Sequence, residues 1–435
     1  MTEKFDAIVV GAGPAGTTAA LVMARAGMKV ALIERGSYPG AKNMFGGVFY
    51  FSEVLNQLIP EFWKEAPIER RIVRRVTAFM TPQASVSMDY ENSNFGKAPY
   101  NGVTLLRSRF DRWYAQKAVD AGAFLIPETV VDDVIREGAR VVGVKTRRDQ
   151  GDLLADVIIA ADGVNSLLAE KAGLKPEKQL HKHSLSVTAK EVLALPQETI
   201  EERFNLAPDE GVAIDYIGSC TEGIQGAAFL YTNKSSLSLG MATDLNSLRE
   251  HKISIADLVE KFKEHPSIKR LIKGATLKEY SGHLMPEAGI HMMPKLYTDG
   301  MLVAGDAAAM VFYTGLNLEG VNFAMASGYY AAEAVKAAKA RNDFSANSLA
   351  QYRKLLEDSF VLKDLKSFSN SSPMLANKRF YTVYPDLMCT LMENMFRVDG
   401  KPRKKMWSIM RQSMKGKISV MELAKDGMQA RKAML

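Results

Sequence analysis

Two apolar runs with an alanine-rich stretch between them begin the chain, and this order predicts a strand, a helix and a second strand. Phe5–Val10 is a short apolar run that ends at a glycine turn, which is typical of a buried strand. Residues 15–26 are rich in alanine and favour a helix that stops at Gly27. Lys29–Ile33 is a second apolar run. We therefore expect a βαβ unit with a right-handed crossover.

The same pattern analysis predicts further elements along the chain. Residues 211–223 are rich in glycine and turn residues, and residues 346–435 are expected to be mainly helical. We predict helices at 108–120, 254–272 and 318–340, strands at 124–134, 141–146, 156–161 and 301–304, and β-like segments at 183–193 and 226–241.

This order of elements predicts an α/β domain whose pieces are scattered along the chain, because a β-rich part interrupts it. At 435 residues the chain is long for one compact unit. A helical, basic C-terminal region is expected at 346–435. We assign 1–75, 101–180 and 281–345 to the α/β domain, and 76–100 and 181–280 to the β-rich domain.

Cysteine is almost absent from the chain, which contains only Cys220 and Cys389. This argues against a disulfide framework, fits a reducing cytoplasm, and excludes an internal four-cysteine metal or iron–sulfur site. The first apolar run already belongs to a strand, so we expect no signal peptide. Since no run of eighteen apolar residues occurs, we also expect no membrane-spanning helix.

The net charge of +7 is concentrated in the tail. Residues 373–435 contain 13 Lys or Arg and 5 Asp or Glu, a net charge of +8, so the rest of the chain is close to neutral. A basic tail suits a lipid surface, an acidic protein or nucleic acid, or it is a solvated helical face. Nucleic acid is disfavoured because no recognition module accompanies the charge.

The first chemical motif is a G-x-G-x-x-G pattern between the first predicted strand and helix. Its glycines allow a tight turn, a close approach of a pyrophosphate and close helix packing. The helix N-terminus offers unpaired N–H groups to phosphates. Glu34, at the end of the second strand, can accept hydrogen bonds from ribose hydroxyls. The motif comprises Gly11, Ala12, Gly13, Pro14, Ala15 and Gly16.

A second motif, more than 280 residues later, decides between NAD and FAD. Residues 301–308 form a predicted strand that ends in Gly305-Asp306. A protein that binds only NAD has no need of a second binding element so far along the chain. FAD does, because its ribityl chain and flavin ring extend well beyond the pyrophosphate. Asp306 would hold the ribityl chain. Gly315, Leu316 and Asn317 are expected to open a helix whose N-terminus faces the flavin and stabilises its reduced form. The alternative for Asp306 is a plain helix cap.

Two weaker motifs lie between them. Residues 156–166 form a strand that ends in Asp162-Gly163, and Arg109 starts a predicted helix from which it can reach a phosphate or the flavin. Arg109 could equally belong to an ordinary surface pair.

Five motifs in this order, GAGPAG, ERG, RxxFDRW, ADGVNS and GDAA, resemble the FAD-binding family of glucose-inhibited-division and aromatic-hydroxylase architecture. Within it, residues 34–50 and 280–308 closely resemble the FixC group, relatives of electron-transfer-flavoprotein:quinone oxidoreductase. The resemblance covers most of residues 1–345. It implies a Rossmann-type FAD-binding domain of aromatic-hydroxylase and geranylgeranyl reductase type, with an inserted β-rich domain and a helical C-terminal region.

The resemblance also implies a function and partners. The chain is expected to accept electrons from a two-subunit electron-transfer flavoprotein and to pass them to a membrane quinone. The larger quinone oxidoreductases carry a four-iron cluster, which two cysteines so far apart cannot hold, so we expect a separate small ferredoxin-like protein. A cytoplasmic protein peripheral on the inner face of the cell membrane is expected. Further cofactor contacts are implied at Arg35, Gly46, Gly47 and Val130.

A quinone site would need apolar lining and a proton donor. Met44, Phe45, Val48, Phe49, Tyr50, Phe312 and Tyr313 could line a channel, although packing in the core is the favoured alternative. His283, His291 and Glu287 are candidate proton donors, and no catalytic acid is assigned. In the tail, Met406, Met410 and Met414 repeat at helical spacing near Trp407 among basic residues, which suits a lipid interface or a partner groove.

Three other functions remain open. A prenyl-lipid reductase of the geranylgeranyl type would share the fold and a lipid-facing pocket. An NADPH-dependent hydroxylase is less favoured because no second glycine motif for a nicotinamide domain appears. A non-catalytic scaffold would have lost its cofactor, whereas the intact Gly305-Asp306 motif predicts a yellow protein.

Overall fold

The computed structural model describes residues 4–42, 47–175, 185–287, 289–314 and 317–434. Contacts divide the chain into two compact units. The first unit comprises Met1–Ile68, Leu105–Ser184 and Leu284–Ser369, and the second unit comprises Glu69–Thr104, Leu185–His283 and Asn370–Leu435. Residues 346–369 thus group with the first unit and residues 370–435 with the second. The functional domain boundaries expected from the sequence stay a prediction.

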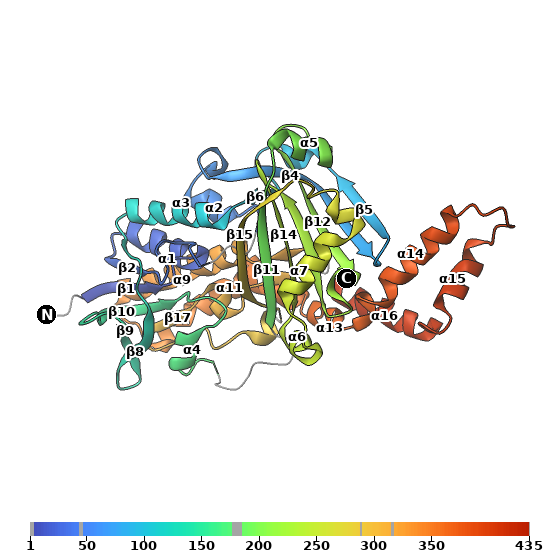
Figure 1. Ribbon diagram of the computed structural model, residues 1–435. Helices are drawn as coiled ribbons and strands as arrows, with labels where there is room; N and C mark the ends of the chain where they lie inside the picture. The colour runs from blue at the N-terminus through green and yellow to red at the C-terminus, as the bar shows by residue number, and fades with distance from the viewer. Residues whose placement is uncertain (1–3, 43–46, 176–184, 288, 315–316, 435) are drawn as a thin grey trace. The chain divides into compact units, whose positions relative to one another are not determined.

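A parallel sheet forms the centre of the first unit (Figure 1). Its order is β16 (Tyr297–Thr298), β17 (Met301–Val303), β10 (Leu153–Ala160), β1 (Lys4–Val10), β2 (Val30–Ile33) and β7 (Phe124–Ile126). All neighbours except β16 and β17 run parallel. The sequence of β1 and β10 is nearly all apolar because such strands are buried on both faces.

Helices cover this sheet, and small residues let two of them approach closely. α1 (Pro14–Arg25) packs against α9 (Val321–Arg341) and against α3 (Arg107–Asp120). A Cβ added at Gly328 of α9 would lie 2.0 Å from the carbonyl oxygen of Ala15, so only glycine permits this crossing. The antiparallel hairpin of β8 (Val131–Glu137) and β9 (Arg140–Thr146) joins the sheet beside β10. Shorter elements are β3 (Val48–Tyr50), α2 (Glu53–Leu58), α4 (Leu167–Lys171), α10 (Ala346–Leu349), α11 (Gln351–Asp358) and α12 (Phe360–Ser367).

The second unit is built on a large, mostly antiparallel sheet. β11 to β14 and β5 pair antiparallel with their neighbours β14, β13 and β4, whereas β12 and β4 pair in parallel. The order is β15 (Thr276–Pro286), β11 (Leu185–Ala194), β14 (Ser236–Asp244), β13 (Gly226–Thr232), β12 (Glu210–Gly218), β4 (Ile68–Met80) and β6 (Gly102–Leu105), with β5 at Ser85–Glu91.

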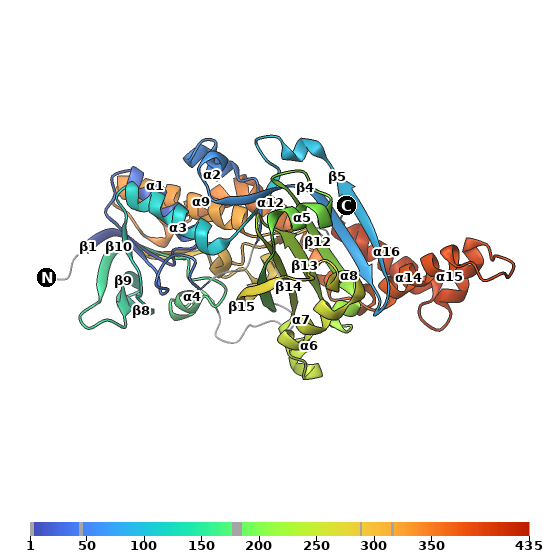
Figure 2. The ribbon, with the colours of Figure 1, turned by 45° about the horizontal axis from the view of Figure 1, so that its top comes forward.

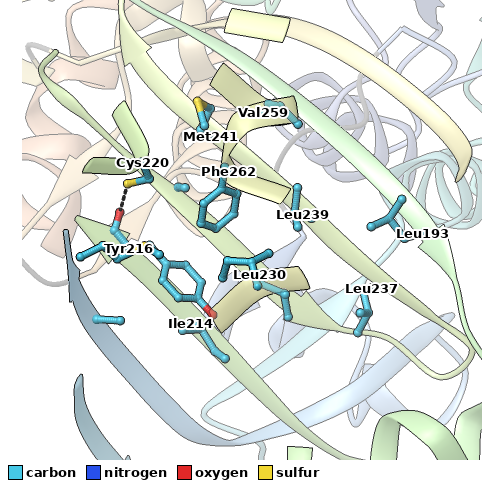
Figure 3. Packing of buried hydrophobic residues seen from close by; sticks show 14 of the residues in the cluster. Leu193, Ile214, Tyr216, Cys220, Leu230, Leu237, Leu239, Met241, Val259 and Phe262 are labelled. Carbon is cyan, nitrogen blue, oxygen red and sulfur yellow. Dashed lines mark hydrogen bonds between the residues drawn. The ribbon is translucent and has the colours of Figure 1, made fainter. Parts of the chain in front are cut away.

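One face of this sheet carries the hydrophobic core of the unit (Figure 3). Side chains of alternate residues on β11 to β14 point towards α7 (Ile255–Glu264), and Phe262 of α7 lies fully buried among them. Its ring meets that of Tyr216 edge to face, with 5.2 Å between centroids. Other helices of this unit are α5 (Gln197–Phe204), α6 (Leu245–His251) and α8 (Pro266–Lys269).

Residues 370–435 form four α-helices and one short 3₁₀ helix of the second unit. The last three α-helices are labelled in Figure 2. α14 (Val383–Phe396) contacts β5 and β12, and α15 (Met406–Met414) packs back against α14. α16 (Val420–Met434) packs on α13 (Ser371–Leu375). No helix in the described ranges is long and apolar enough to cross a membrane.

Most predicted helices and strands are confirmed, and several are corrected. Residues 211–223, expected to be a turn region, mostly belong to strand β12, where Val212, Ile214 and Tyr216 face the hydrophobic core at every second position. The strand expected at 124–134 is broken between β7 and β8, and the helix expected at 254–272 is broken before Pro266. The long helix begins at Val321 rather than at Leu318, because Leu318–Glu319 pairs with Phe312–Tyr313 as a short hairpin.

Candidate functional site

Four strands of the first unit end at one edge of its sheet, and the predicted motifs follow those ends. β1, β2, β10 and β17 are parallel neighbours, so their carboxyl ends lie together. Gly11, Glu34, Ala161 and Ala304 are the residues that follow them. Ligands of open α/β sheets bind at this edge. The structure therefore brings together three motifs that are far apart in the sequence.

The glycine motif leaves space for a ligand at the N-terminus of α1. Gly11 has a φ of +100°, and a Cβ there would lie 2.2 Å from the carbonyl oxygen of Ala161. A Cβ at Gly16 would lie 1.9 Å from the carbonyl oxygen of Gly11. Gly13 differs, because no other heavy atom lies within 4 Å of the position that its Cβ would take. Gly11 and Gly16 are thus required for packing, whereas Gly13 leaves the helix end accessible to a phosphate.

Glu34 is fixed at the end of β2 by two backbone amides. The N–H of Gly36 donates to its Oε1 at 2.6 Å, and the N–H of Ala12 donates to its Oε2 at 3.1 Å. The side chain is 9% exposed, so the carboxylate is held between the glycine turn and the second strand. A carboxylate has further lone pairs, with which it can accept hydroxyl hydrogen bonds from a ribose.

Gly305 and Asp306 begin a short 3₁₀ turn after β17. Gly305 has a φ of +67°, and its N–H donates to Oγ of Ser327 on α9 at 2.8 Å. Among the residues that the structure describes, no side-chain hydrogen bond reaches the Asp306 carboxylate. Burial raises the pKa of Asp306, and the charge of Arg107 opposes this rise. The carboxylate is thus buried near a positive charge and is able to accept hydrogen bonds from a ligand.

Arg107 and Asp111 form an ion pair one helical turn apart on α3. Nε and one terminal nitrogen of Arg107 each donate to Asp111 at 2.9 Å, and the two side chains are only 5% and 2% exposed. Although burial opposes its charge, the pKa of Arg107 is raised by Asp111 and, more weakly, by Asp306. Arg107 therefore remains a cation and supplies positive charge beside the Gly-Asp motif.

Asp162 follows β10 and is only partly satisfied. Its Oδ2 accepts from the N–H of Leu168 at 3.0 Å, while its buried Oδ1 has no hydrogen-bond partner within the described ranges. Burial raises the pKa of this carboxyl group. A buried oxygen without a partner is costly, so Asp162 fits a ligand with a donor group at this position.

Other predicted cofactor residues lie around this edge without a resolved role. Arg35 is exposed, and Arg109 is exposed in the first turn of α3. Val130 lies between β7 and β8, where its carbonyl accepts from the N–H of Arg147. Gly47 pairs with Leu105 through its carbonyl. Asn317 was expected to open a helix, but it bonds Thr314 between the short strands β18 (Phe312–Tyr313) and β19 (Leu318–Glu319), and the helix begins only at Val321. Gly46, Gly315 and Leu316 lie outside the described residues, and the contacts expected of all these residues stay predictions.

The candidate quinone residues divide between core and surface. Phe49 packs against Phe62 and Phe110, and Phe312 stacks on Phe323, so both phenylalanines are core residues. Tyr50 and Tyr313 are half-buried, and Val48 begins β3. Met44 and Phe45 fall outside the described residues.

His283, His291 and Glu287 stay candidate proton donors. His291 is exposed, and its Nε2 lies 3.1 Å from the carbonyl oxygen of Ser369. The backbone carbonyl of His283 accepts from Thr188, and Glu287 is half-buried.

Both cysteines are free and buried, and burial raises the pKa of the Cys220 thiol to about 12. Within the part of the chain that the structure describes, no cluster of three or more metal-ligating side chains occurs.

Four contributors to the site were not assigned a role from the sequence. Asp111 pairs with Arg107, Ser327 holds the Gly305 amide, and Gly328 permits the approach of α9 to α1. The Arg-x-x-x-Asp spacing on a predicted helix could have indicated the ion pair, because residues i and i+4 share a face. Ser327 and Gly328 lie within an alanine-rich helix, where nothing local distinguishes them.

The residues present fit a dinucleotide at this edge. The free space at Gly13, the unpartnered Asp162 oxygen and the Asp306 carboxylate lie at the carboxyl ends of three neighbouring strands. Gly13 and the first turn of α1 suit the pyrophosphate, Glu34 suits a ribose, and Asp306 suits the hydroxyls of a ribityl chain.

Comparison with known proteins identifies the relatives of both ends of the chain. The model of FAD-dependent oxidoreductases matches residues 6–184, and that of the ETF-QO/FixC family C-terminal domain matches residues 371–435. The first match confirms FAD as the cofactor. A probable electron transfer flavoprotein-quinone oxidoreductase of Escherichia coli is 42% identical over 99% of both chains. Protein FixC of Bradyrhizobium diazoefficiens is 43% identical over 92% of both chains.

Solved structures confirm the fold. A geranylgeranyl bacteriochlorophyll reductase-like protein from Thermoplasma acidophilum has a TM-score of 0.72 at 22% identity, over 98% of this chain and 99% of that one. A flavin-dependent brominase has a TM-score of 0.63 at 18% identity, over 95% and 98% of the two chains. Identities this low show a shared architecture and leave the reaction open.

Proposed function

The chain belongs to the ETF-QO/FixC family of FAD-dependent oxidoreductases, and from this premise we propose that it passes electrons from a two-subunit electron-transfer flavoprotein to a membrane quinone. The observation that carries the proposal is the 42% identity, over 99% of both chains, to a probable electron transfer flavoprotein-quinone oxidoreductase. Similarity that extends through the C-terminal family domain supports a shared reaction better than a shared cofactor fold does. The prenyl-lipid reductase alternative rests on fold alone.

A separate ferredoxin-like protein is the second part of the proposal. The chain contains two cysteines, Cys220 and Cys389, which are both buried and free. A four-iron cluster needs four thiolates, so this chain cannot hold one. An iron–sulfur partner would supply the single-electron step between the flavoprotein and this chain.

The residues of the chain have defined tasks in this scheme. The first turn of α1 and Gly13 bind the pyrophosphate, and Glu34 orients the ribose next to it. Asp306 positions the ribityl chain, while Arg107 keeps positive charge beside that carboxylate. When bound, FAD supplies the redox chemistry, because it exchanges electrons singly with iron–sulfur centres and in pairs with quinones. The chain thus contributes position and electrostatics.

We place the protein at the cytoplasmic face of the cell membrane. A lipid-soluble quinone requires an acceptor site that opens towards lipid, and residues 373–435 carry a net charge of +8. A basic surface is attracted to the anionic lipids of the inner leaflet.

The test is a reconstituted electron-transfer assay. The FAD-loaded chain is mixed with both flavoprotein subunits and the ferredoxin-like protein, and reduction of a water-soluble quinone analogue is followed after the flavoprotein is reduced. We expect turnover that requires all components and that is lost in Asp306→Ala. Absence of turnover with a saturated FAD site would refute the proposal. Conversion of a polyprenyl lipid by the same chain would support the reductase alternative instead.

A further inference from the structure

The large sheet of the second unit has a second face, whose side chains differ from those of the hydrophobic core. Figure 3 shows Ile214 and Tyr216 of β12 among the core residues. Because side chains alternate along a strand, Asp215 between them points to the opposite face. Strand pairing places Asp215 in one row with residues of four other strands. The row comprises Lys190 (β11), Gly240 (β14), Phe229 (β13), Asp215 (β12) and Thr77 (β4).

Arg75 of β4 is an ionic partner of Asp215. One terminal nitrogen of Arg75 donates to Oδ2 of Asp215 at 3.1 Å. Burial raises the pKa of Asp215, and the positive charge of Arg75 opposes this rise. The Asp215 side chain is nevertheless 28% exposed, so water reaches the carboxyl group. The surroundings thus favour a protonated acid, Arg75 stabilises its anion, and solvent can return the proton.

An aromatic pair lies beside Asp215 on β13. Phe229 is the residue directly opposite Asp215, and its ring stacks on that of Tyr231 with 4.7 Å between centroids. Phe229 is 5% exposed, whereas Tyr231 is half-buried. On its other side Phe229 is opposite Gly240, where a Cβ would lie 2.8 Å from the Phe229 ring. Glycine thus makes room for the aromatic pair, and a flat apolar surface adjoins the acid.

Other ionisable side chains of this face come from three strands. Within the described residues they include Lys190 of β11, Tyr231 of β13 and Tyr90 of β5. α14 contacts β12, and its acidic residues Asp386 and Glu393 are each paired with a basic side chain. Arg75 is therefore the charge that acts most directly on Asp215.

We propose that Asp215 donates a proton to an oxygen of the quinone as the quinone is reduced, and that Arg75 stabilises the carboxylate that remains. The inference rests on the proposed function, which supplies the quinone and the electrons. A quinone is a flat ring with two carbonyl oxygens, so it matches an acid beside an aromatic surface. The quinone oxygens gain negative charge on reduction, and a positioned general acid accelerates such a step about 100- to 10,000-fold.

The step is balanced by two electrons and two protons. Reduction converts both carbonyl groups of the quinone to hydroxyl groups, and the electron pair comes from the reduced cofactor together with one proton. The second proton comes from Asp215, whose O–H bond breaks as an O–H bond of the quinol forms. The Asp215 carboxylate then takes up a proton from water through the exposed part of its side chain.

The first test compares an acceptor that needs protons with one that needs none. The flavin of the FAD-loaded full-length chain is reduced chemically, and its reoxidation is followed by absorbance after rapid mixing. A water-soluble quinone analogue takes electrons and protons, whereas ferricenium takes a single electron and no proton. We expect Asp215→Asn to slow reoxidation by the quinone analogue at least ~100-fold and to leave reoxidation by ferricenium unchanged. Equal rates of parent and variant with the quinone analogue, or equal losses with both acceptors, would overturn the inference.

A neighbouring ion pair provides the matched control. Asp89 of β5 pairs with Arg74 of β4, and the hydrogen bond from Arg74 lowers the pKa of Asp89. An ionised aspartate has no proton to give, so Asp89→Asn should leave both rates unchanged. If Asp89→Asn slows the quinone reaction as much as Asp215→Asn does, the loss of an ion pair explains the effect, and the assignment of the acid fails.

The dependence on pH distinguishes an acid from a structural carboxylate. Because a donor must be protonated, the quinone reaction of the parent should slow as the pH rises through the raised pKa of Asp215. Asp215→Asn should be slow throughout, and Asp215→Glu, which keeps an acidic group, should recover part of the rate. Arg75→Gln removes the charge that lowers the pKa, so it should move the fall in rate to higher pH. The same pH profile in the parent and in Asp215→Asn would contradict the proposal.

Infrared difference spectroscopy gives a readout without turnover. In the oxidised FAD-loaded chain, the difference between the parent and Asp215→Asn should contain the C=O band of a protonated carboxyl group at pH values at which an exposed aspartate is ionised. Absence of this band would show that Asp215 has no proton to donate. If the parent itself does not reduce the quinone analogue, the proposed function is wrong and the inference falls with it. Reduction by the parent and equally by Asp215→Asn refutes the inference alone.

Discussion

At the scale of single residues, the flavin site depends on buried charges that support one another. The buried carboxylate of Asp306, which is expected to bind the ribityl chain, interacts with the charge of Arg107. Arg107 is itself buried and paired with Asp111. Removing one member of such a pair leaves an unpaired charge in the interior, which is far more costly than removing a surface pair.

Asp111→Asn should therefore lower both stability and FAD affinity. We expect a loss of about 3 kcal/mol in the free energy of unfolding, because Arg107 would keep its buried charge without its partner. Denaturant unfolding and the FAD content of the purified protein measure the two effects. Asp120→Asn on the same helix is the control, since Asp120 is exposed and accepts a hydrogen bond from the Gln116 side chain. A similar small effect of both variants would contradict the role of the pair.

Gly13→Ala separates binding from folding. No other heavy atom lies within 4 Å of the added Cβ, so the change in stability of the FAD-free protein should stay below about 1 kcal/mol. The methyl group would occupy space that the pyrophosphate needs, so FAD affinity should fall roughly 100-fold, equivalent to about 3 kcal/mol. Titration of the FAD-free protein with FAD measures this. Gly427→Ala, which also meets open space, should change only helix stability, and normal FAD binding by Gly13→Ala would contradict the assignment.

At the scale of elements, the sequence was sufficient where periodicity and a motif coincided. The β1–α1–β2 unit was predictable because its apolar runs are bounded by glycines. Strand β12 was not predictable, since Gly211, Gly218 and Gly223 suggested turns. Pairing with neighbouring strands determines that residues 210–218 form a strand, and this pairing is not visible in the local sequence. The partnership of Asp306 with Arg107 was also hidden, because nearly 200 residues separate them and only the fold brings them together.

The C-terminal helices are joined by one buried carboxylate. Asp426 of α16 accepts two bonds of 2.6 Å from Arg379, one from Tyr384 and one from Asn377. Mainly through the Arg379 hydrogen bonds, the pKa of Asp426 is lowered to about 2. A carboxyl group whose pKa is lowered in the folded protein stabilises the fold at pH values above its ordinary pKa near 4. This stabilisation, about 2 kcal/mol, is lost as the pH falls towards 2.

Asp426→Asn should consequently loosen α16 at neutral pH and weaken the acid dependence of its docking. Hydrogen exchange of α16 amides between pH 6 and pH 3 is the measurement, with intrinsic exchange rates taken into account. The parent should lose protection as the pH falls, whereas the variant should already have low protection. Asp399→Asn, in the exposed segment between α14 and α15, should behave as the parent. Parent-like protection in Asp426→Asn would show that the clamp is dispensable.

At the scale of the whole molecule, the two units contribute different properties to one FAD-dependent oxidoreductase. The first unit contains the dinucleotide edge, and the second carries the basic ETF-QO/FixC C-terminal domain. The sequence was sufficient to predict the cofactor and the family from motifs. The sequence also located the basic tail. The structure adds that basic and apolar residues are exposed where α14 ends and α15 begins.

The central claim is that electrons pass from an electron-transfer flavoprotein through this chain to a quinone. The most direct measurement is an anaerobic single-turnover experiment on the FAD-loaded chain with its flavoprotein and ferredoxin-like partners, in which the visible absorbance of the flavin is recorded. We predict that the reduced flavoprotein bleaches the FAD of this chain only when the ferredoxin-like protein is present, and that a quinone analogue restores the colour with stoichiometric quinol formation. Bleached FAD that a quinone analogue cannot reoxidise, or FAD that remains oxidised with all partners present, would contradict the account.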